Sequence, residues 1–186
     1  MNNMTLSTTR LRLREFADHD FAWLHEIASN PEVTRYTEWG PNTPQDTTDF
    51  LDDATSAGSG PEIYLWAVTL TDGSGIGSAS LHVVSATHRR ARFGYMLDPT
   101  CWGSGYATEI ATELVVFAFD VLSLRRVEAT SHPDNAASAR VLEKAGLVLE
   151  GRMRSHLLAR GTWRDSLLWA ALDTDPRSHP MPTAMR

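Results

Sequence analysis

A strand that ends in a two-glycine loop and leads directly into a long amphipathic helix most constrains the fold of this 186-residue chain. The segment Ala91 to Leu97 has the pattern of a strand and ends at Asp98-Pro99. From Ala107 to Leu122, apolar residues recur at i, i+3, i+4 and i+7, which predicts a helix with one buried face. A further strand at Arg126 to Thr130 completes a strand-helix-strand unit, which is typical of an α/β protein.

The remaining periodicities place other elements around this unit. Strands are expected at 10–16, 63–69, 76–84, 147–157 and 163–172. Helices are expected at 18–28, capped by Asp18, at 44–57, and between an N-cap at Asn135 and Gly146. This order predicts a mixed, partly antiparallel sheet of about seven strands with about four helices. Residues 1–172 are expected to form one domain, and the polar, proline-containing tail 173–186 is expected to be disordered.

Composition excludes several kinds of protein. Cys101 is the only cysteine, so an internal disulfide is impossible and no metal site is predicted. The chain has no run of about 18 apolar residues and no apolar stretch of a secretory signal, so a cytoplasmic protein that does not enter a membrane is expected. The net charge of −6 argues against a nucleic-acid-binding protein, which needs a basic surface.

The loop Trp102-Gly103-Ser104-Gly105-Tyr106-Ala107 suits an anion. The first turn of a helix leaves backbone N–H groups unpaired and carries partial positive charge. Because Gly103 and Gly105 have no side chain, a phosphate can approach the backbone closely. A tight turn that binds nothing explains the same residues equally well. The loop lacks the Gly-Lys-Ser/Thr of a Walker loop and the third glycine of a dinucleotide-binding fingerprint.

A second motif favours the functional interpretation. Trp-Gly-Ser-Gly-Tyr-Ala-Thr-Glu at 102–109, followed by Asn135-Ala136-Ala137-Ser138, resembles the paired motifs of the GCN5-related N-acetyltransferases (GNAT superfamily). Within this superfamily the chain is similar to the RimJ/RimL-type ribosomal-protein N-terminal acetyltransferases. The resemblance extends from Thr9-Arg10-Leu11-Arg12-Leu13-Arg14 to Trp163-Arg164-Asp165.

The resemblance implies a mostly antiparallel sheet that splays at its middle and holds acetyl-CoA in the gap. The pantetheine would pair with the backbone of one central strand, the diphosphate would lie on the loop, and Asn135 and Ser138 would lie beside the thioester. The implied cofactor-binding residues are Tyr95, Met96, Leu97, Trp102, Gly103, Ser104, Gly105, Tyr106, Ala107, Thr108, Asn135 and Ser138. Taken alone, Asn135 and Ser138 have the pattern of a helix cap and an early-turn serine.

The chain departs from the family at two positions that matter for chemistry. Many members have a tyrosine in the second motif helix that protonates the leaving thiolate, and Leu142 stands there. Ser138 is then the nearest candidate, and a serine donates a hydrogen bond rather than delivering a proton outright. Relatives also often have a glutamate base where this chain has Arg92, which cannot deprotonate an amine.

A site with few bases favours an acceptor amine that loses its proton easily. A lysine amine, with a pKa of ~10.4, is neutral at pH 7 only about one part in a thousand, whereas an α-amine with a pKa of ~7.7 to 8.0 is neutral roughly a fifth of the time. An α-amine, a sugar amine or a similarly acidic nitrogen is therefore favoured. His82 and Glu150 remain as candidate bases, although each also fits an ordinary strand position.

Three further residues are candidates for binding the acceptor, together with His82. Tyr36 and Trp39 lie in the loop after the first helix, where aromatics suit either ligand contact or a minor core. Asp165 could face the amine or pair with Arg164 or Arg160.

These observations predict an acyl-CoA-dependent N-acyltransferase that moves an acetyl group from acetyl-CoA to a primary amine by direct attack. The acceptor is a protein or peptide N-terminal α-amine or a small-molecule amine, and the resemblance allows a homodimer. Ser138, Asn135 and Glu150 are the candidate catalytic residues. Three alternatives stay open: transfer from another acyl-CoA such as succinyl-CoA, with Arg92 as the extra cation; a CoA-binding sensor without catalysis; and a resistance or peptide-tailoring enzyme.

Overall fold

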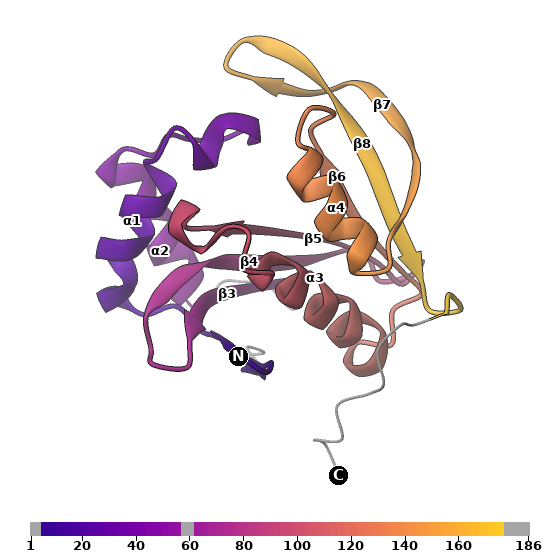
Figure 1. Cartoon of the computed structure of the whole chain (residues 1–186), viewed down its shortest axis with the longest axis horizontal. Helices are drawn as coiled ribbons and strands as arrows, with labels where there is room; N and C mark the ends of the chain where they lie inside the picture. Colours follow the sequence, from indigo (N-terminus) through magenta and orange to yellow (C-terminus); the bar gives the residue numbers. More distant parts are fainter. Residues whose placement is uncertain (1–4, 57–61, 177–186) are drawn as a thin grey trace.

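The computed structural model describes residues 5–56 and 62–176, which form an eight-stranded sheet and four α-helices (Figure 1). The strands are β1 (Leu6–Ser7), β2 (Leu11–Arg14), β3 (Ile63–Leu70), β4 (Gly75–Ser85), β5 (Arg90–Leu97), β6 (Arg126–Ser131), β7 (Val148–Ala159) and β8 (Thr162–Leu172). The helices are α1 (Phe21–Ala28), α2 (Pro44–Thr55), α3 (Tyr106–Val116) and α4 (Ala136–Lys144). Short 3₁₀ turns lie at Asp18–Asp20, Val33–Tyr36 and Pro99–Cys101.

The sheet has the order β1-β2-β3-β4-β5-β6-β8-β7. Every neighbouring pair is antiparallel except β5 and β6, which run parallel on either side of α3 in the sequence. The predicted mixed α/β fold, mostly antiparallel and with four helices, is confirmed. The strand missed by sequence is β1, whose two residues are too few for a periodicity to show.

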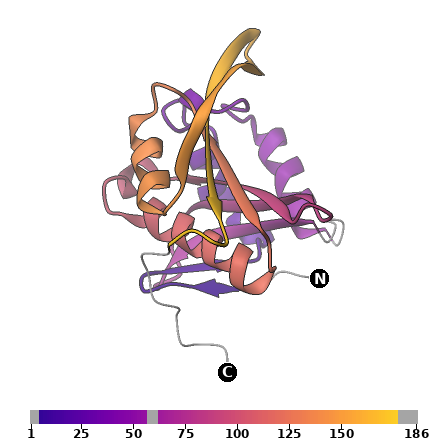
Figure 2. The same ribbon diagram turned by 90° about the vertical axis from the view of Figure 1, so that its right-hand side faces the viewer.

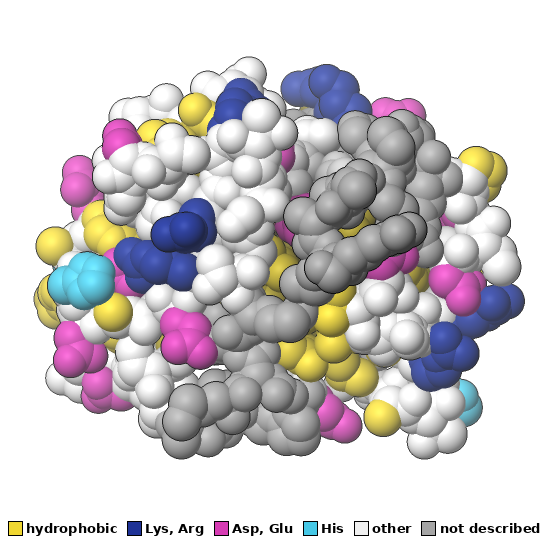
Figure 3. Space-filling model, turned by 90° about the horizontal axis from the view of Figure 1, so that it is seen from below, with side chains coloured by type: hydrophobic (Ala, Val, Ile, Leu, Met, Phe, Trp, Pro, Cys, Tyr) yellow, Lys and Arg dark blue, Asp and Glu magenta, His cyan; other side chains and the backbone are white. Residues whose placement is uncertain are grey.

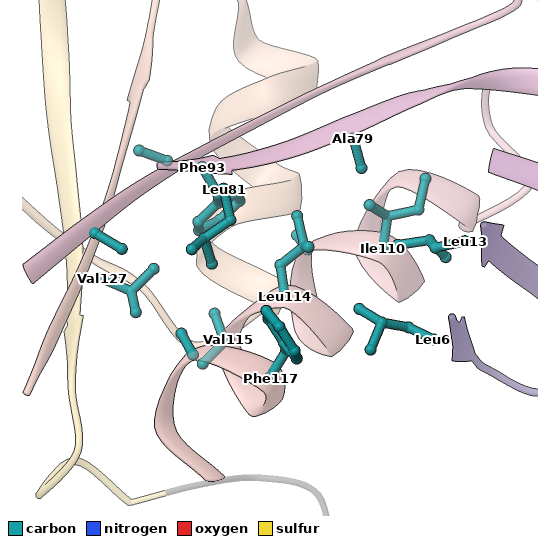
Figure 4. Packing of buried hydrophobic residues seen from close by; sticks show 14 of the residues in the cluster. Leu6, Leu13, Ala79, Leu81, Phe93, Ile110, Leu114, Val115, Phe117 and Val127 are labelled. Atoms are coloured by element: carbon teal, nitrogen blue, oxygen red, sulfur yellow. The ribbon is translucent and has the colours of Figure 1, made fainter. Parts of the chain in front are cut away.

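Alternation along the strands divides the core between the two faces of the sheet. On β3, Trp66 and Val68 belong to a large cluster with α3, α4 and the central strands, whereas Ala67 belongs to a second cluster with α1 and α2. Figure 4 shows the large cluster, in which Ile110 and Leu114 of α3 lie against the strands. The helices therefore cover both faces, α3 and α4 on one and α1 and α2 on the other.

Two helix details differ from the sequence expectation. The predicted helix 107–122 ends as α-helix at Val116 and continues as a π-helical turn, Phe117–Val121. The wider turn buries three successive residues from Phe117 to Phe119, so Val121, expected on the buried face, is 43% exposed. Asp18, the predicted cap, lies in a 3₁₀ turn before α1, and the N-cap position of α1 is Asp20, whose buried carboxylate accepts the Ala17 N–H at 2.9 Å.

The outer hairpin β7–β8 extends beyond the rest of the sheet (Figure 2). Its tip is tied to the loop after α1, because the Arg160 guanidinium donates to the carbonyls of Thr34, Trp39 and Gly40 at 2.8, 3.1 and 2.9 Å. This contact fixes the loop over the sheet. Residue 57, the last residue of the helix expected at 44–57, and most of the expected tail, from 177 on, lie outside the described residues.

Within the described part of the chain, no helix is long and apolar enough to cross a membrane. On the face seen in Figure 3, the Lys and Arg side chains of the described residues lie among Asp and Glu side chains rather than in one patch.

Candidate active site

The glycine loop between β5 and α3 is shaped by its own residues. Asp98 accepts the Thr100 N–H at 2.7 Å, and the Trp102 indole donates to the Leu97 carbonyl at 3.0 Å. Gly103 and Gly105 have φ angles of 75° and 84°, in the left-handed region that favours glycine. The loop therefore makes two sharp reversals immediately before α3.

The N-terminus of α3 opens toward this loop. Its N-cap is Gly105, which has no side chain to accept the N–H groups of the first turn. No heavy atom lies within 4 Å of the position that a side chain at Gly103 would take. These unpaired donors and this free space fit a diphosphate, the role that the family resemblance implies for the N–H groups from Gly103 to Thr108.

Arg10, immediately before β2, contacts the loop from outside. Its guanidinium donates to the Ser104 carbonyl at 3.0 Å and to Glu109 of α3 at 2.8 Å, and it lies 4.5 Å from the centre of the Tyr106 ring. Burial alone would raise the pKa of Glu109, but hydrogen bonds from Thr8 and Arg10 outweigh burial and hold that pKa below its ordinary value. Sequence reasoning missed Arg10, because 99 residues separate it from Glu109.

The sheet opens between β5 and β6. The two strands pair only from Arg90–Arg126 to Arg92–Glu128, so β5 continues to Leu97 without a neighbour on that side (Figure 1). Arg90 and Arg126 form ion pairs with the buried Glu128, at 2.9 and 2.6 Å. These ion pairs hold β5 and β6 together where the two strands begin to diverge.

Backbone alternation decides which groups of β5 face this gap. The Asp98 N–H donates to the Ile76 carbonyl of β4. Because backbone groups point to alternate sides along a strand, the N–H and C=O of Met96 also point toward β4, whereas those of Tyr95 and Leu97 point into the gap. The Leu97 carbonyl is already used by Trp102. The strand that the sequence assigned to pantetheine pairing therefore lies at the gap, with Tyr95 and Leu97 rather than Met96 presenting backbone N–H groups.

The start of α4 faces the same gap. Asn135 caps the helix by accepting the Ser138 N–H at 3.0 Å, and the hydroxyls of Ser138 and Tyr95 lie 3.2 Å apart. Burial raises the pKa of Tyr95, although its hydrogen bond to Ser138 opposes the shift. Leu142 is 1% exposed and belongs to the main core. The structure thus brings Ser138 together with Tyr95, a hydroxyl partner that sequence reasoning did not identify.

A cavity of about 980 Å³ lies on the other face of β4 and β5, under α1, α2 and the loop after α1. Its apolar wall includes Phe50, Leu65 and Met96, and its polar residues include Asp46 and Asp53, both on α2. The residues that line it are Leu24, Ala28, Thr37, Trp39, Gly40, Asn42, Asp46, Thr47, Phe50, Asp53, Ser56, Ile63, Leu65, Ser78, Ala79, Ser80, His82, Gly94, Tyr95 and Met96.

Two of the four predicted acceptor residues, Trp39 and His82, line this cavity. His82 is exposed at the edge of the cavity, but partial desolvation lowers its pKa, and the positive charge of Arg92, its register partner on β5, lowers the pKa further. The imidazole is therefore neutral at neutral pH and able to accept a proton. Asp46 and Asp53 were missed, although their spacing of seven residues puts them on one face of a helix.

The other two, Tyr36 and Asp165, lie in a separate pocket of about 60 Å³. Tyr36 stacks on His132, with 5.0 Å between ring centres. Asp165 accepts the Ser155 N–H at 2.9 Å and pairs with Arg152 at 2.7 Å, which lowers its pKa and braces the β7–β8 hairpin. Its partner is thus Arg152 rather than Arg164 or Arg160.

Glu150 is also held in an ion pair. Arg126 donates to both of its carboxylate oxygens, one at 2.7 Å, and this hydrogen bonding lowers the pKa of Glu150. A carboxylate whose charged form is stabilised in this way is a weaker base. These contacts argue against Glu150 as the general base.

Comparison with known proteins agrees with this geometry. A family model described as an acetyltransferase (GNAT) domain matches residues 10–148. The chain is 30% identical to the uncharacterized N-acetyltransferase YoaA of Bacillus subtilis (strain 168), over 89% of this chain and 94% of that protein. It is 25% identical to spermidine N(1)-acetyltransferase of Escherichia coli (strain K12), over 87% of this chain and 85% of that protein.

A solved structure with the same fold is that of RimL, a ribosomal L7/L12 alpha-N-protein acetyltransferase, in complex with coenzyme A. It matches with a TM-score of 0.81 and 19% identity, over 92% of this chain and 100% of that chain.

Proposed function

From the premise that this chain belongs to the GNAT acetyltransferase family, we propose that it transfers an acetyl group from acetyl-CoA directly to a small cationic primary amine. Membership makes the chain an acyl-CoA-dependent N-acyltransferase, with acetyl-CoA as co-substrate. One observation carries the finer proposal: the gap between β5 and β6 and the acceptor cavity meet at Tyr95, which contacts Ser138 on one side and borders the cavity on the other.

The residues of the gap bind acetyl-CoA. The α3 N–H groups from Tyr106 to Thr108 and the open backbone at Gly103 take the diphosphate. The backbone edge of β5 at Tyr95 and Leu97 takes the pantetheine, and its N–H groups polarise the carbonyl. Acetyl-CoA supplies a thioester, whose carbonyl carbon an uncharged amine can attack without a covalent enzyme intermediate.

The cavity selects the amine by charge. Asp46 and Asp53 line it, and none of its described lining residues is Lys or Arg. A positively charged group is therefore attracted to the α2 side, while Phe50, Leu65 and Met96 contact an apolar linker. The likeness to spermidine N(1)-acetyltransferase, whose name gives a polyamine substrate, supports a small cationic amine over a protein N-terminus.

His82 removes the proton from the amine. It lines the cavity, and its lowered pKa keeps it unprotonated at neutral pH. It thereby replaces the family's strand glutamate, whose position is Arg92, the residue opposite His82 in the register of β4 and β5. Arg92 thus favours the neutral form of the base instead of acting as one.

A thiol-release screen with acetyl-CoA tests the proposal. The acceptor panel contains diamines and polyamines, matched monoamines, amino acids, aminoglycosides and peptides with free N-termini. We expect the highest kcat/KM with an acceptor that has a second ammonium group. Turnover confined to peptides would contradict the acceptor class, faster release from succinyl-CoA would contradict acetyl-CoA as donor, and CoA binding without release from any amine would contradict catalysis.

A further inference from the structure

Tyr95 occupies the boundary between the two halves of the site. It lies on β5 three residues beyond Arg92, the last residue paired with β6, so the backbone edge of β5 is open beside it. Its hydroxyl reaches α4, where it lies 3.2 Å from the Ser138 hydroxyl, and the residue also borders the acceptor cavity. Nothing in the packing of β5 requires a hydroxyl here, since Phe93 on the same face is fully apolar.

Ser138 is fixed in place beside it. The Asn135 side chain accepts the Ser138 N–H at 3.0 Å, which orients the first turn of α4. The helix offers no phenol of its own at the position of Leu142, whose side chain is enclosed in the core. The only phenol that the described residues bring within hydrogen-bonding distance of Ser138 comes from β5.

We propose that Tyr95 and Ser138 form a two-hydroxyl proton relay that delivers a proton to the thiolate of CoA as it leaves. This inference rests on the proposed acetyl transfer and assigns its acid, which the family's helix tyrosine would otherwise supply. Tyr95 acts through Ser138, and Ser138 is the group that touches the sulfur.

Each proton in the relay has a donor and an acceptor. The nitrogen–carbon bond forms and the carbon–sulfur bond breaks, with its electron pair remaining on sulfur. Sulfur takes the Ser138 hydroxyl proton, and Ser138 takes the Tyr95 proton in the same step. The ammonium gives its first proton to His82 before attack, and the second proton, which the nitrogen loses after its bond to the carbonyl carbon forms, restores the Tyr95 hydroxyl. No free alkoxide forms, so the weakness of serine as an acid does not limit the step.

The surroundings of Tyr95 keep its hydroxyl protonated. Burial raises its pKa above the ordinary value of about 10, so the phenol holds its proton at neutral pH. The residue opposite it on β4 is Ala79, which is uncharged. A neutral relay is thus poised beside the sulfur.

The test compares Tyr95→Phe, Ser138→Ala and the double variant, with Tyr64→Phe as a matched control. Tyr64 is also buried, with a pKa raised by burial, but it packs against Phe117 in the core away from the gap. Tyr95→Phe should lower kcat about 100-fold, the scale of general acid catalysis. It should leave the Kd of CoA unchanged, and Tyr64→Phe should keep wild-type kcat.

Two further readouts separate a relay from a structural role. The ultraviolet absorbance of bound CoA reports the pKa of its thiol, which should be higher in Tyr95→Phe and in Ser138→Ala than in the wild type. Ser138→Ala removes the donor to the thiolate, and Tyr95→Phe removes the hydrogen bond to Ser138 that strengthens this donor. Effects of the two substitutions on kcat should not add in the double variant, since they interrupt one relay.

Three outcomes would overturn the relay: Tyr95→Phe retains kcat within about twofold, the pKa of the bound thiol does not move, or the two single effects add fully. If the wild type transfers no acetyl group to any amine, the proposed function fails instead, and the thiol titration still reports whether Ser138, and Tyr95 through it, stabilises the thiolate.

Discussion

Substituting Gly103 by alanine separates cofactor binding from loop stability. Gly103 has a φ of 75°, and no heavy atom lies within 4 Å of the position a methyl group would take. The substitution therefore causes no clash and acts in two ways: it strains the backbone, and it puts a methyl group where we place the diphosphate.

The two effects have different sizes. A left-handed conformation costs an alanine about 1–2 kcal/mol, of which about 0.4–1 kcal/mol is offset by the reduced entropy of the unfolded chain. A net loss of about 1 kcal/mol lowers the Tm of a domain of this size by roughly 2–4 °C. Loss of one hydrogen bond to a charged phosphate costs about 1.5–3 kcal/mol, which weakens the Kd of CoA about 10- to 100-fold.

Gly73 provides the matched control. It lies in the turn between β3 and β4, has a φ of 93°, and likewise has no heavy atom within 4 Å of the position that a methyl group would take. Gly73→Ala should therefore lower the Tm to a similar extent, as measured by thermal unfolding. Its Kd for CoA, measured by titration calorimetry, should match the wild type. If Gly103→Ala binds CoA as tightly as Gly73→Ala, the loop does not hold the diphosphate.

Three other substitutions test neighbouring parts of the site. Arg10→Gln removes the support of the Ser104 carbonyl and should weaken CoA binding about tenfold in calorimetry, on the scale of a charged hydrogen bond; an unchanged Kd would limit Arg10 to stability. In the wild type, kcat should fall as the pH drops through the pKa of His82, which burial and Arg92 hold below the ordinary His value of about 6.5. His82→Gln should abolish this acidic limb of the kcat–pH profile. An acidic limb that persists would remove His82 as the base. Asp53→Asn should raise KM for a dicationic amine up to about fivefold, the range of an exposed ion pair, whereas Asp52→Asn, which does not line the cavity, should leave KM unchanged; equal effects would refute selection by the cavity.

Most elements of the fold could be predicted from local sequence patterns. The alternation on β3, β4 and β5, the period of α3 and the Asn135 cap all depend on neighbours in sequence, so their elements could be predicted within a few residues. β1 was missed because two residues show no period, and the π-helical turn was missed because burial of Phe117 to Phe119 is decided by packing.

The site likewise has parts that the sequence predicts and parts that it does not. The glycine loop and the start of α4 are continuous segments whose backbone chemistry can be read in order. Arg10 with Glu109 and Tyr95 with Ser138 are pairs 99 and 43 residues apart, so no local pattern indicates them. The pairing of Glu150 with Arg126 and of Asp165 with Arg152 likewise depends on the register of β6, β7 and β8, which sequence alone did not fix.

The most direct measurement of the central claim uses acetyl-CoA with an isotopically labelled acetyl group. The purified protein is incubated with the best amine of the panel, and mass spectrometry of the amine is compared with the amount of CoA thiol released. We predict one labelled acetyl group on the amine nitrogen for each thiol released, with His82→Gln slowing both equally. Thiol release without a labelled amine, or CoA binding with neither, would contradict the claim that the cofactor gap and the acceptor cavity form one N-acetyltransferase site.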